Sequence, residues 1–98
     1  MGKTHLNIGY FSFFTGAGFL DLGFEDAGYE SYLANELEPD FARVYKFSHA
    51  HMKKPLPKFG LNEGDVCRYL TEPKIGSDLA SKIDDARKEM DLVGFIGG

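Results

Sequence analysis

The sequence predicts an α/β protein built on a doubly wound, mainly parallel sheet. Short apolar or aromatic segments alternate with amphipathic ones along its 98 residues, and there is no internal repeat. A glycine-broken stretch, "TGAG" at residues 15–18, connects the first apolar segment to the first amphipathic one. The final segment, "DLVGFI" at residues 91–96, is a continuous apolar run of the kind that central strands of parallel sheets contain.

The first strand and the first helix are expected before residue 28. Residues 7–14, "NIGYFSFF", are short, aromatic and β-prone, as a buried strand requires. The segment after Gly18 repeats its apolar residues at helical spacing, and its acidic residues share the opposite side. The apolar set is Leu20, Phe24 and Ala27, and the acidic set is Asp21 and Glu25. This pattern predicts a helix that packs its apolar side on the sheet and stops at Gly28.

A second strand and a second helix follow. Residues 29–35, "YESYLAN", alternate as a strand does, and Pro39 suits the first position of the next helix. The apolar stripe of this helix is expected to be Phe41, Val44 and Tyr45.

The rest of the chain predicts a loop, a brief strand, a helix and a last strand. Residues 49–63 contain two prolines and no periodic pattern, which indicates a loop that leads to a short third strand near Gly64 and Asp65. Ser77 is a suitable cap for the clearest helix, whose stripe is Leu79, Ile83, Ala86 and Met90. Residues 91–96 then form a strand, so the sheet is expected to be truncated after about its fourth strand.

The composition indicates a single small globular domain over residues 1–98. Its 43% apolar content is too high for a disordered chain and too interrupted by charge for a membrane span. The net charge of −4 means that any basic surface for nucleic acid lies elsewhere. The first residues show no apolar secretory signal, so the cytoplasm is the expected compartment.

The candidate binding site lies where the first strand turns into the first helix. In doubly wound sheets, ligands bind beyond the carboxyl ends of the strands. Glycines there let the backbone approach a ligand, and amides at the helix start favour an anionic group. These residues are Thr15, Gly16, Ala17 and Gly18, and the alternative is that they form only a strand-to-helix turn. No lysine follows them, so a P-loop is a poor fit.

Two acidic residues extend this candidate site. Glu36 lies about 20 residues beyond the glycine turn, where an acidic side chain binds ribose hydroxyls in dinucleotide-binding folds. Asp65, near the third strand, would bind the amino group of a base. Phe14 would pack against a planar adenine. The alternatives are a solvated carboxylate at Glu36, a plain turn at Asp65 and a core aromatic at Phe14.

Together these segments resemble the cytosine-C5 DNA methyltransferases, a family with the Rossmann-like class I S-adenosylmethionine-dependent methyltransferase fold. The stretch "FFTGAGFLDLGFEDAGYE" is similar to the first family motif, although Phe19 stands where a third glycine is often found. "ANELEPDFARVY", "GDV" and "DLVGFIGG" are similar to the next motifs in order. The resemblance implies that S-adenosylmethionine is bound by Phe14, Thr15, Gly16, Ala17, Gly18, Phe19, Leu20, Glu36, Leu37, Asp65, Val66 and Gly97.

The resemblance also implies what the chain lacks. In this family a Pro-Cys loop carries the nucleophilic thiolate, and that loop is expected just after Gly98, with the DNA-reading region further on. DNA would therefore contact the missing part of a parent bacterial enzyme, of the restriction-modification type. Cys67 is interpreted as a small buried hydrophobe and not as the nucleophile. No metal site is expected from His5, His49 and His51, and the exposed last strand is expected to promote self-association.

Two other functions remain open on the sequence. The chain would act as a non-catalytic module that pairs with a partner chain, or as a nicotinamide-dependent oxidoreductase domain, because a glycine turn with a downstream acid also describes that fold.

Overall fold

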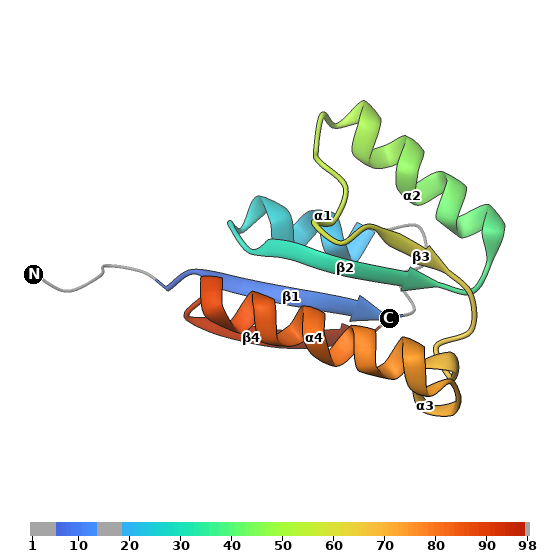
Figure 1. Ribbon diagram of the computed structural model, residues 1–98. Helices are drawn as coiled ribbons and strands as arrows, with labels where there is room; N and C mark the ends of the chain where they lie inside the picture. The colour runs from blue at the N-terminus through green and yellow to red at the C-terminus, as the bar shows by residue number, and fades with distance from the viewer. Residues whose placement is uncertain (1–5, 14–18, 98) are drawn as a thin grey trace, which may run out of the picture.

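The protein forms a four-stranded sheet with helices on both faces in a computed structural model (Figure 1). The structure describes residues 6–13 and 19–97. The elements are, in chain order, β1 (Ile8–Phe13), α1 (Phe19–Asp26), β2 (Glu30–Glu36), α2 (Pro39–His51), β3 (Leu61–Glu63), α3 (Arg68–Thr71), α4 (Pro73–Glu89) and β4 (Leu92–Gly97).

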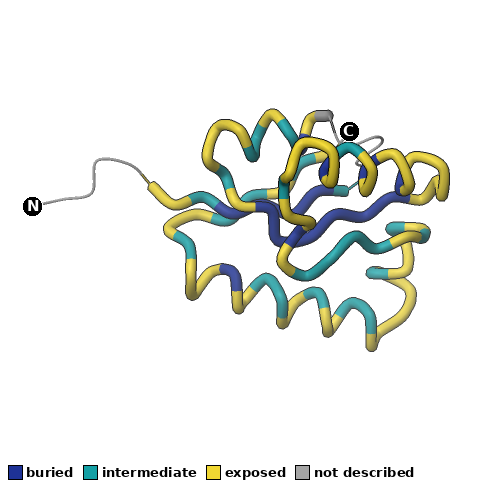
Figure 2. The backbone as a smooth tube through the Cα atoms, turned by 90° about the horizontal axis from the view of Figure 1, so that it is seen from above, coloured by how far each residue is buried: buried dark blue, intermediate teal, exposed yellow. Residues whose placement is uncertain are grey.

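The sheet has the order β3-β2-β1-β4, and each neighbouring pair is parallel. Helices α1 and α2 lie on one face of the sheet and α4 on the other, with the buried strands between them (Figure 2). Every strand ends at the same edge, on the right of Figure 1. The expected doubly wound, parallel α/β fold is therefore confirmed, and its carboxyl edge is the place where ligand-binding residues gather.

The face covered by α4 has an apolar core. Phe11, Tyr32 and Leu33 from the sheet and Ala86 from α4 are fully buried. The predicted stripe of α4 packs against them, since its other three members belong to the same cluster: Leu79, Ile83 and Met90. This stripe is confirmed.

A change of register between β1 and β2 places an additional aromatic ring in this core. Tyr10 pairs with Ser31, but the next residue, Phe11, pairs with Leu33, so Tyr32 is passed over. Its ring stacks on Phe11 with centroids 6.0 Å apart. The space that Tyr32 fills lies over Gly9, where a Cβ atom would come within 2.5 Å of the tyrosine ring. Gly9 is therefore required by the packing of this ring.

The orientation of α1 differs from the prediction. Asp21 is 1% exposed and lies against the sheet, whereas Leu20 is 50% exposed. Ala27 is also exposed, and Phe24 is half-buried. Of the predicted apolar side, only Phe24 packs against the sheet, where its ring lies 5.6 Å from the ring of Tyr10. The rest of that side is outermost, because Asp21 occupies the inner side with the buried polar contacts described below. The expected end at Gly28 is confirmed, with α1 ending at Asp26 and Gly28 at a φ of +93°.

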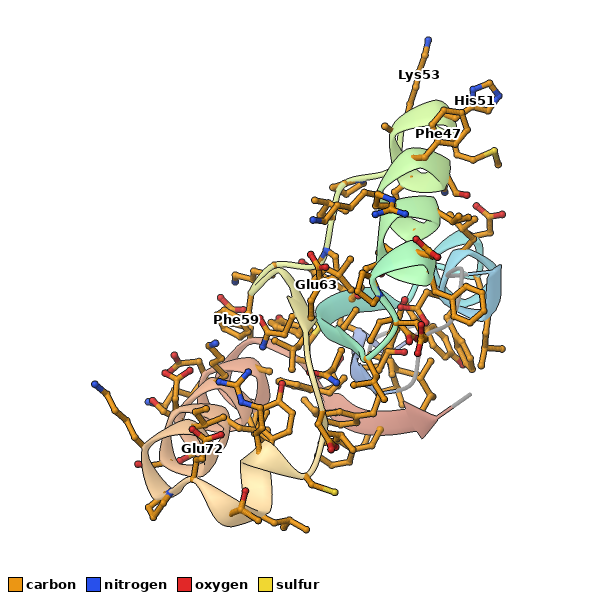
Figure 3. The ribbon with its side chains drawn as sticks, turned by 90° about the vertical axis from the view of Figure 1, so that its right-hand side faces the viewer. Phe47, His51, Lys53, Phe59, Glu63 and Glu72 are labelled. Atoms are coloured by element: carbon orange, nitrogen blue, oxygen red, sulfur yellow. The ribbon has the colours of Figure 1, made fainter. Side chains whose placement is uncertain are left out.

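Helix α2 begins at Pro39 as predicted, but Tyr45 is the one member of its predicted stripe that is buried. Phe41 and Val44 are exposed, and the buried residues are Ala42, Tyr45 and His49. The helix also continues to His51, into the segment that was expected to be a loop. Near its end the rings of Phe47 and His51 stack at 6.0 Å and point away from the sheet (Figure 3).

The segment from β3 to α4 is shifted from the prediction. Strand β3 ends at Glu63, so Gly64 and Asp65 form the turn after it. A short helix that the sequence did not indicate, α3, follows. Helix α4 then begins at Pro73, four residues before Ser77, so Ser77 is not its cap. Gly76 allows this early start, because a Cβ atom there would lie 2.5 Å from the carbonyl oxygen of Tyr69 in α3.

Strand β4 is confirmed, and it lies at the exposed edge of the sheet, as expected for a sheet truncated after its fourth strand. It pairs with β1 along its whole length, and Leu92 and Phe95 are more than half exposed. Self-association through this edge stays a prediction. Within residues 6–13 and 19–97, none of the helices is both long and apolar enough to cross a bilayer.

Replacing Gly9 by alanine is expected to destabilise the protein by about 1–3 kcal/mol, because the new methyl group overlaps the buried ring of Tyr32. Urea denaturation measures this difference. Gly94→Ala in β4 is the matched control, since a Cβ atom there meets no atom within 4 Å. Equal stabilities of the two variants would refute the packing argument.

Candidate cofactor site at the carboxyl ends of the strands

The structure brings the predicted site residues that it describes to one edge of the sheet. Glu36 ends β2 and Leu37 follows it, Asp65 and Val66 follow β3, and Gly97 ends β4 in register with Phe13 of β1. Phe19 and Leu20 begin α1. The residues expected to form the glycine turn, together with Phe14, lie outside the described residues: Phe14, Thr15, Gly16, Ala17 and Gly18.

The Glu36 carboxylate is held in a fixed orientation. The residue is only 6% exposed, and its Oε2 accepts a hydrogen bond of 2.8 Å from the backbone N–H of Glu38. Leu37, between them, exposes half of its side chain. A fixed carboxylate beside an exposed apolar side chain suits a ligand that has both hydroxyl groups and a flat apolar ring.

The turn after β3 is attached directly to β2. The N–H of Gly64 donates to the carbonyl oxygen of Glu36 at 3.0 Å, and its own carbonyl accepts from the side-chain amide of Asn35 at 3.1 Å. Gly64 has a φ of +148°, which favours glycine. Asp65 follows, and its Oδ1 accepts from the N–H of Cys67 at 2.9 Å. Glu36 and Asp65 are therefore connected through a single residue, Gly64.

Cys67 does not have the environment of a nucleophile. Its thiol is exposed, so the expectation that it is buried is wrong. A hydrogen bond with Asp65 and the negative charge of that residue raise the pKa of the Cys67 thiol. Reactive cysteines need the opposite shift, because the thiolate is the attacking species.

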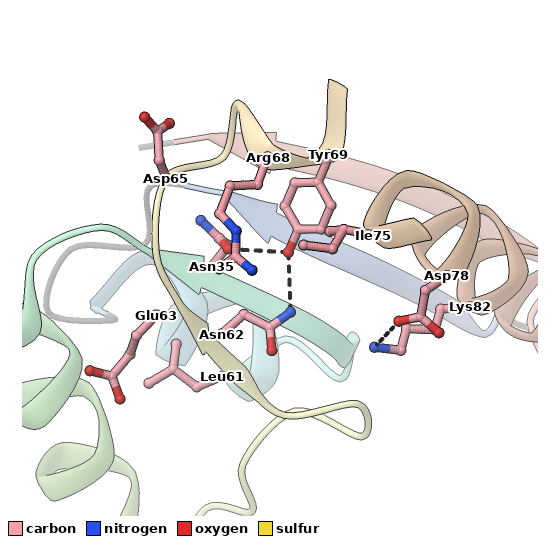
Figure 4. Close-up of a pocket in the computed structure, with 10 residues that line it drawn as sticks. All are labelled: Asn35, Leu61, Asn62, Glu63, Asp65, Arg68, Tyr69, Ile75, Asp78 and Lys82. Carbon is pink, nitrogen blue, oxygen red and sulfur yellow. Dashed lines mark hydrogen bonds and ion pairs between the residues drawn. The ribbon is translucent and has the colours of Figure 1, made fainter. Parts of the chain in front are cut away.

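A hydrogen-bonded chain of three polar side chains lies next to this turn, on the α4 face of the sheet (Figure 4). Asn62 Nδ2 donates to the hydroxyl of Tyr69 at 3.1 Å, and that hydroxyl donates to Oδ1 of Asn35 at 3.1 Å. The three residues line a cavity of about 330 Å³ that also includes Asp65.

These three residues were not predicted from the sequence. One signal was available: Asn35 directly precedes Glu36, and it projects to the face whose other strand residues are mostly aromatic or aliphatic.

The opposite face is held by buried polar contacts. Ser12 Oγ of β1 donates to Oδ1 of Asp21 at 2.8 Å, and the Tyr45 hydroxyl of α2 donates to Oδ2 at 3.0 Å. Burial raises the pKa of Asp21, and these two hydrogen bonds oppose the shift. The contacts tie the end of β1 to the first turn of α1, next to the predicted ligand turn.

A second buried pair extends this network. His49 is fully buried, and its Nε2 lies 3.1 Å from Oε1 and 3.0 Å from Oε2 of Glu25. Its Nδ1 lies 3.0 Å from the carbonyl oxygen of Tyr45, and the two rings stack at 4.1 Å. His49 therefore joins α2 to α1. No cluster of three His, Cys, Asp or Glu side chains within the described part of the chain is placed to hold a metal ion.

The fold and this edge define a Rossmann-like α/β protein, with acidic residues following its second and third strands. The chain belongs to the C-5 cytosine-specific DNA methylases, because the profile of that family matches residues 8–65, more than half of its length. The matched segment contains β1 to β3 and the Gly64–Asp65 turn.

Two relatives from Neisseria support this assignment. The chain is 46% identical over 90 residues to the type II methyltransferase M.NmeDI of Neisseria meningitidis serogroup C, covering 90% of the chain and 21% of that relative. It is 44% identical over 61 residues to the type II methyltransferase M.NgoPII of Neisseria gonorrhoeae, covering 62% of the chain and 16% of that relative. The chain thus spans about a fifth of the length of these relatives. No solved structure shows a significant match.

Replacing Asp21 by asparagine is expected to change how stability depends on pH. Burial raises the pKa of Asp21 in the folded state, so its contribution is fully present below the unfolded pKa and is lost as the pH rises through the folded value. The variant lacks this loss, so it should gain stability relative to wild type as the pH rises above about 4, the ordinary pKa of an aspartate.

Urea denaturation at a series of pH values measures this difference, with Asp84→Asn on the exposed side of α4 as the control for loss of a charge. A difference between Asp21→Asn and wild type that stays constant with pH would show that burial does not dominate the ionisation of Asp21.

Proposed function

We propose that residues 1–98 form the cofactor-binding part of an enzyme that transfers a methyl group from S-adenosylmethionine to C5 of cytosine in DNA. The observation that carries this proposal is the connection of Glu36 to Asp65 through Gly64, at the edge where such folds bind ligands. Membership of the methylase family supports it and implies a methyl donor.

The residues of the edge fit the parts of S-adenosylmethionine. The oriented carboxylate of Glu36 would accept hydrogen bonds from the ribose hydroxyls, and Asp65 would accept from the adenine amino group. Leu37 and Phe14 would lie against the adenine. The amides of residues 15–18 would bind the carboxylate of the cofactor. Val66 and Gly97 would line the same binding site. The bound cofactor supplies an electrophilic methyl group.

The reaction also requires groups that these residues do not include. We assign the attack on C6 of a flipped-out cytosine to a cysteine thiolate outside this chain, because the chain's single cysteine is Cys67, whose pKa is raised. Contacts to DNA are likewise assigned to other parts of the protein. The family match favours this function over a nicotinamide-dependent oxidoreductase.

Replacing Glu36 by glutamine is expected to lower the affinity for S-adenosylhomocysteine by roughly tenfold or more. The change removes charge-assisted hydrogen bonds, which contribute about 1.5–3 kcal/mol, while its amide oxygen still accepts from the N–H of Glu38. Calorimetric titration of the full-length protein measures the affinity.

Glu38→Gln is the matched control for this experiment. Glu38 is exposed and lies two residues away, at the start of α2, so its replacement should change the affinity little. Equal affinities of wild type and Glu36→Gln would reject the ribose assignment. Equal losses in the two variants would reject the distinction between the two carboxylates.

The 98-residue chain is expected to transfer no methyl groups when it is assayed alone, because its single thiol is shifted away from the thiolate form. Incubation with DNA and tritiated S-adenosylmethionine measures this, and label at cytosine C5 would overturn the assignment. In the full-length protein, Cys67→Ser should leave the rate of methyl transfer unchanged. A large loss of rate in that variant would show that Cys67 takes part in the reaction.

A further inference from the structure

We propose that Tyr69 and Asn35 are positioning residues of the methyl-donor site, which set the orientation of Asp65 through the Gly64 peptide. This inference rests on the proposed function, since it concerns how the same site recognises the adenine. Neither residue needs to touch the ligand for this role.

The hydrogen bonds run in one direction, from Asn62 to Tyr69, from Tyr69 to Asn35 and from Asn35 to Gly64. Figure 4 draws the first two of these bonds. The hydroxyl of Tyr69 has one hydrogen, and it donates this hydrogen to Oδ1 of Asn35. The amide of Asn35 must then direct its NH₂ group toward the Gly64 carbonyl. Bonds aligned in this way polarise one another, so the last bond is strengthened by the first two.

The last bond acts on the peptide that leads into Asp65. The carbonyl of Gly64 and the N–H of Asp65 belong to one planar unit, so fixing that carbonyl fixes the direction in which Asp65 leaves the turn. Gly64 has no Cβ atom and has a φ of +148°, so its own backbone preferences restrain this unit weakly. The restraint has to come from neighbours, and Asn35 supplies it at 3.1 Å.

Tyr69 is itself held independently of its hydroxyl group. Its ring meets the ring of Phe13 edge-on at a centroid distance of 5.8 Å. Its backbone carbonyl lies against Gly76 of α4, at a distance that no larger residue would allow. Loss of the hydroxyl should therefore leave the ring in place and break only the chain of hydrogen bonds.

This chain of hydrogen bonds also couples the two acidic residues of the site, Glu36 and Asp65. Asn35 and Glu36 are adjacent in β2 and project to opposite faces of the sheet. Asn35 holds the carbonyl of Gly64, and the main chain of Glu36 holds its N–H. The position of the turn that carries Asp65 is thus fixed relative to β2, the strand that carries Glu36, the proposed ribose ligand.

The test is a double-mutant cycle for S-adenosylhomocysteine binding by the full-length protein, measured by calorimetry. Tyr69→Phe is expected to lower the affinity by about 3–10-fold, the loss typical of one neutral hydrogen bond. Asp65→Ala is expected to lower it roughly tenfold or more. If Tyr69 acts through Asp65, the double variant binds no more weakly than Asp65→Ala alone.

Tyr29→Phe is the matched control, because Tyr29 precedes the amino end of β2, far from the site, and its replacement should leave the affinity unchanged. If Tyr69→Phe does not fold, as judged by circular dichroism, Asn62→Ala replaces it in the cycle. That variant removes the first donor of the chain and should give a smaller loss with the same coupling to Asp65.

The outcomes separate this inference from the proposed function. Absence of binding by the wild-type protein overturns the proposed function. Binding by wild type with no loss in Tyr69→Phe overturns the positioning role alone. Losses that add in the double variant also overturn it, because they would show that Tyr69 only stabilises the fold. A double variant equal to Asp65→Ala supports it.

Discussion

The alternation of side chains along β1 determines how the rest of the molecule is built. This strand lies inside the sheet, with α4 on one face and α1 and α2 on the other, so each of its faces must be matched by its own layer. Phe11 and Phe13 face α4, so the layer that packs against them is apolar. Tyr10 and Ser12 face α1 and α2, and their hydroxyl groups require buried acceptors, both of which Asp21 provides. One layer of the protein is therefore apolar and the other polar, because β1 has phenylalanine side chains on one face and hydroxyl groups on the other.

Apart from the short helix α3, the order of the elements and the direction of the strands were predictable, because they follow from local patterns of apolar residues and turns. The orientation of α1 was not predictable. A periodicity argument assigns acidic residues to solvent, whereas Asp21 is buried by donors from β1 and α2, which lie far from it in the sequence. The same polar layer explains α2, where His49 takes a buried position opposite Glu25 and leaves Phe41 outside.

In the candidate site, too, some residues were predictable from the sequence and others were not. Glu36 and Asp65 were found from motif spacing, and the structure places them at one edge because parallel strands end together. Asn35, Asn62 and Tyr69 were missed, because their role depends on strand register and on the short helix α3. Neither has a local signal: three residues of strand and four of helix are too short for a period to be recognised.

The apolar and polar layers meet at the end of β2, so substitutions in the two layers affect different parts of the site. Asn35 belongs to the α4 layer and Glu36 to the opposite one, yet both hold Gly64, Asn35 at its carbonyl and the main chain of Glu36 at its N–H. Changes in the buried network around Asp21 act on the start of α1, and changes around Tyr69 act on the turn after β3. These two networks share no side chain, so their effects on stability should add, whereas a change at Gly64 affects both acidic residues at once.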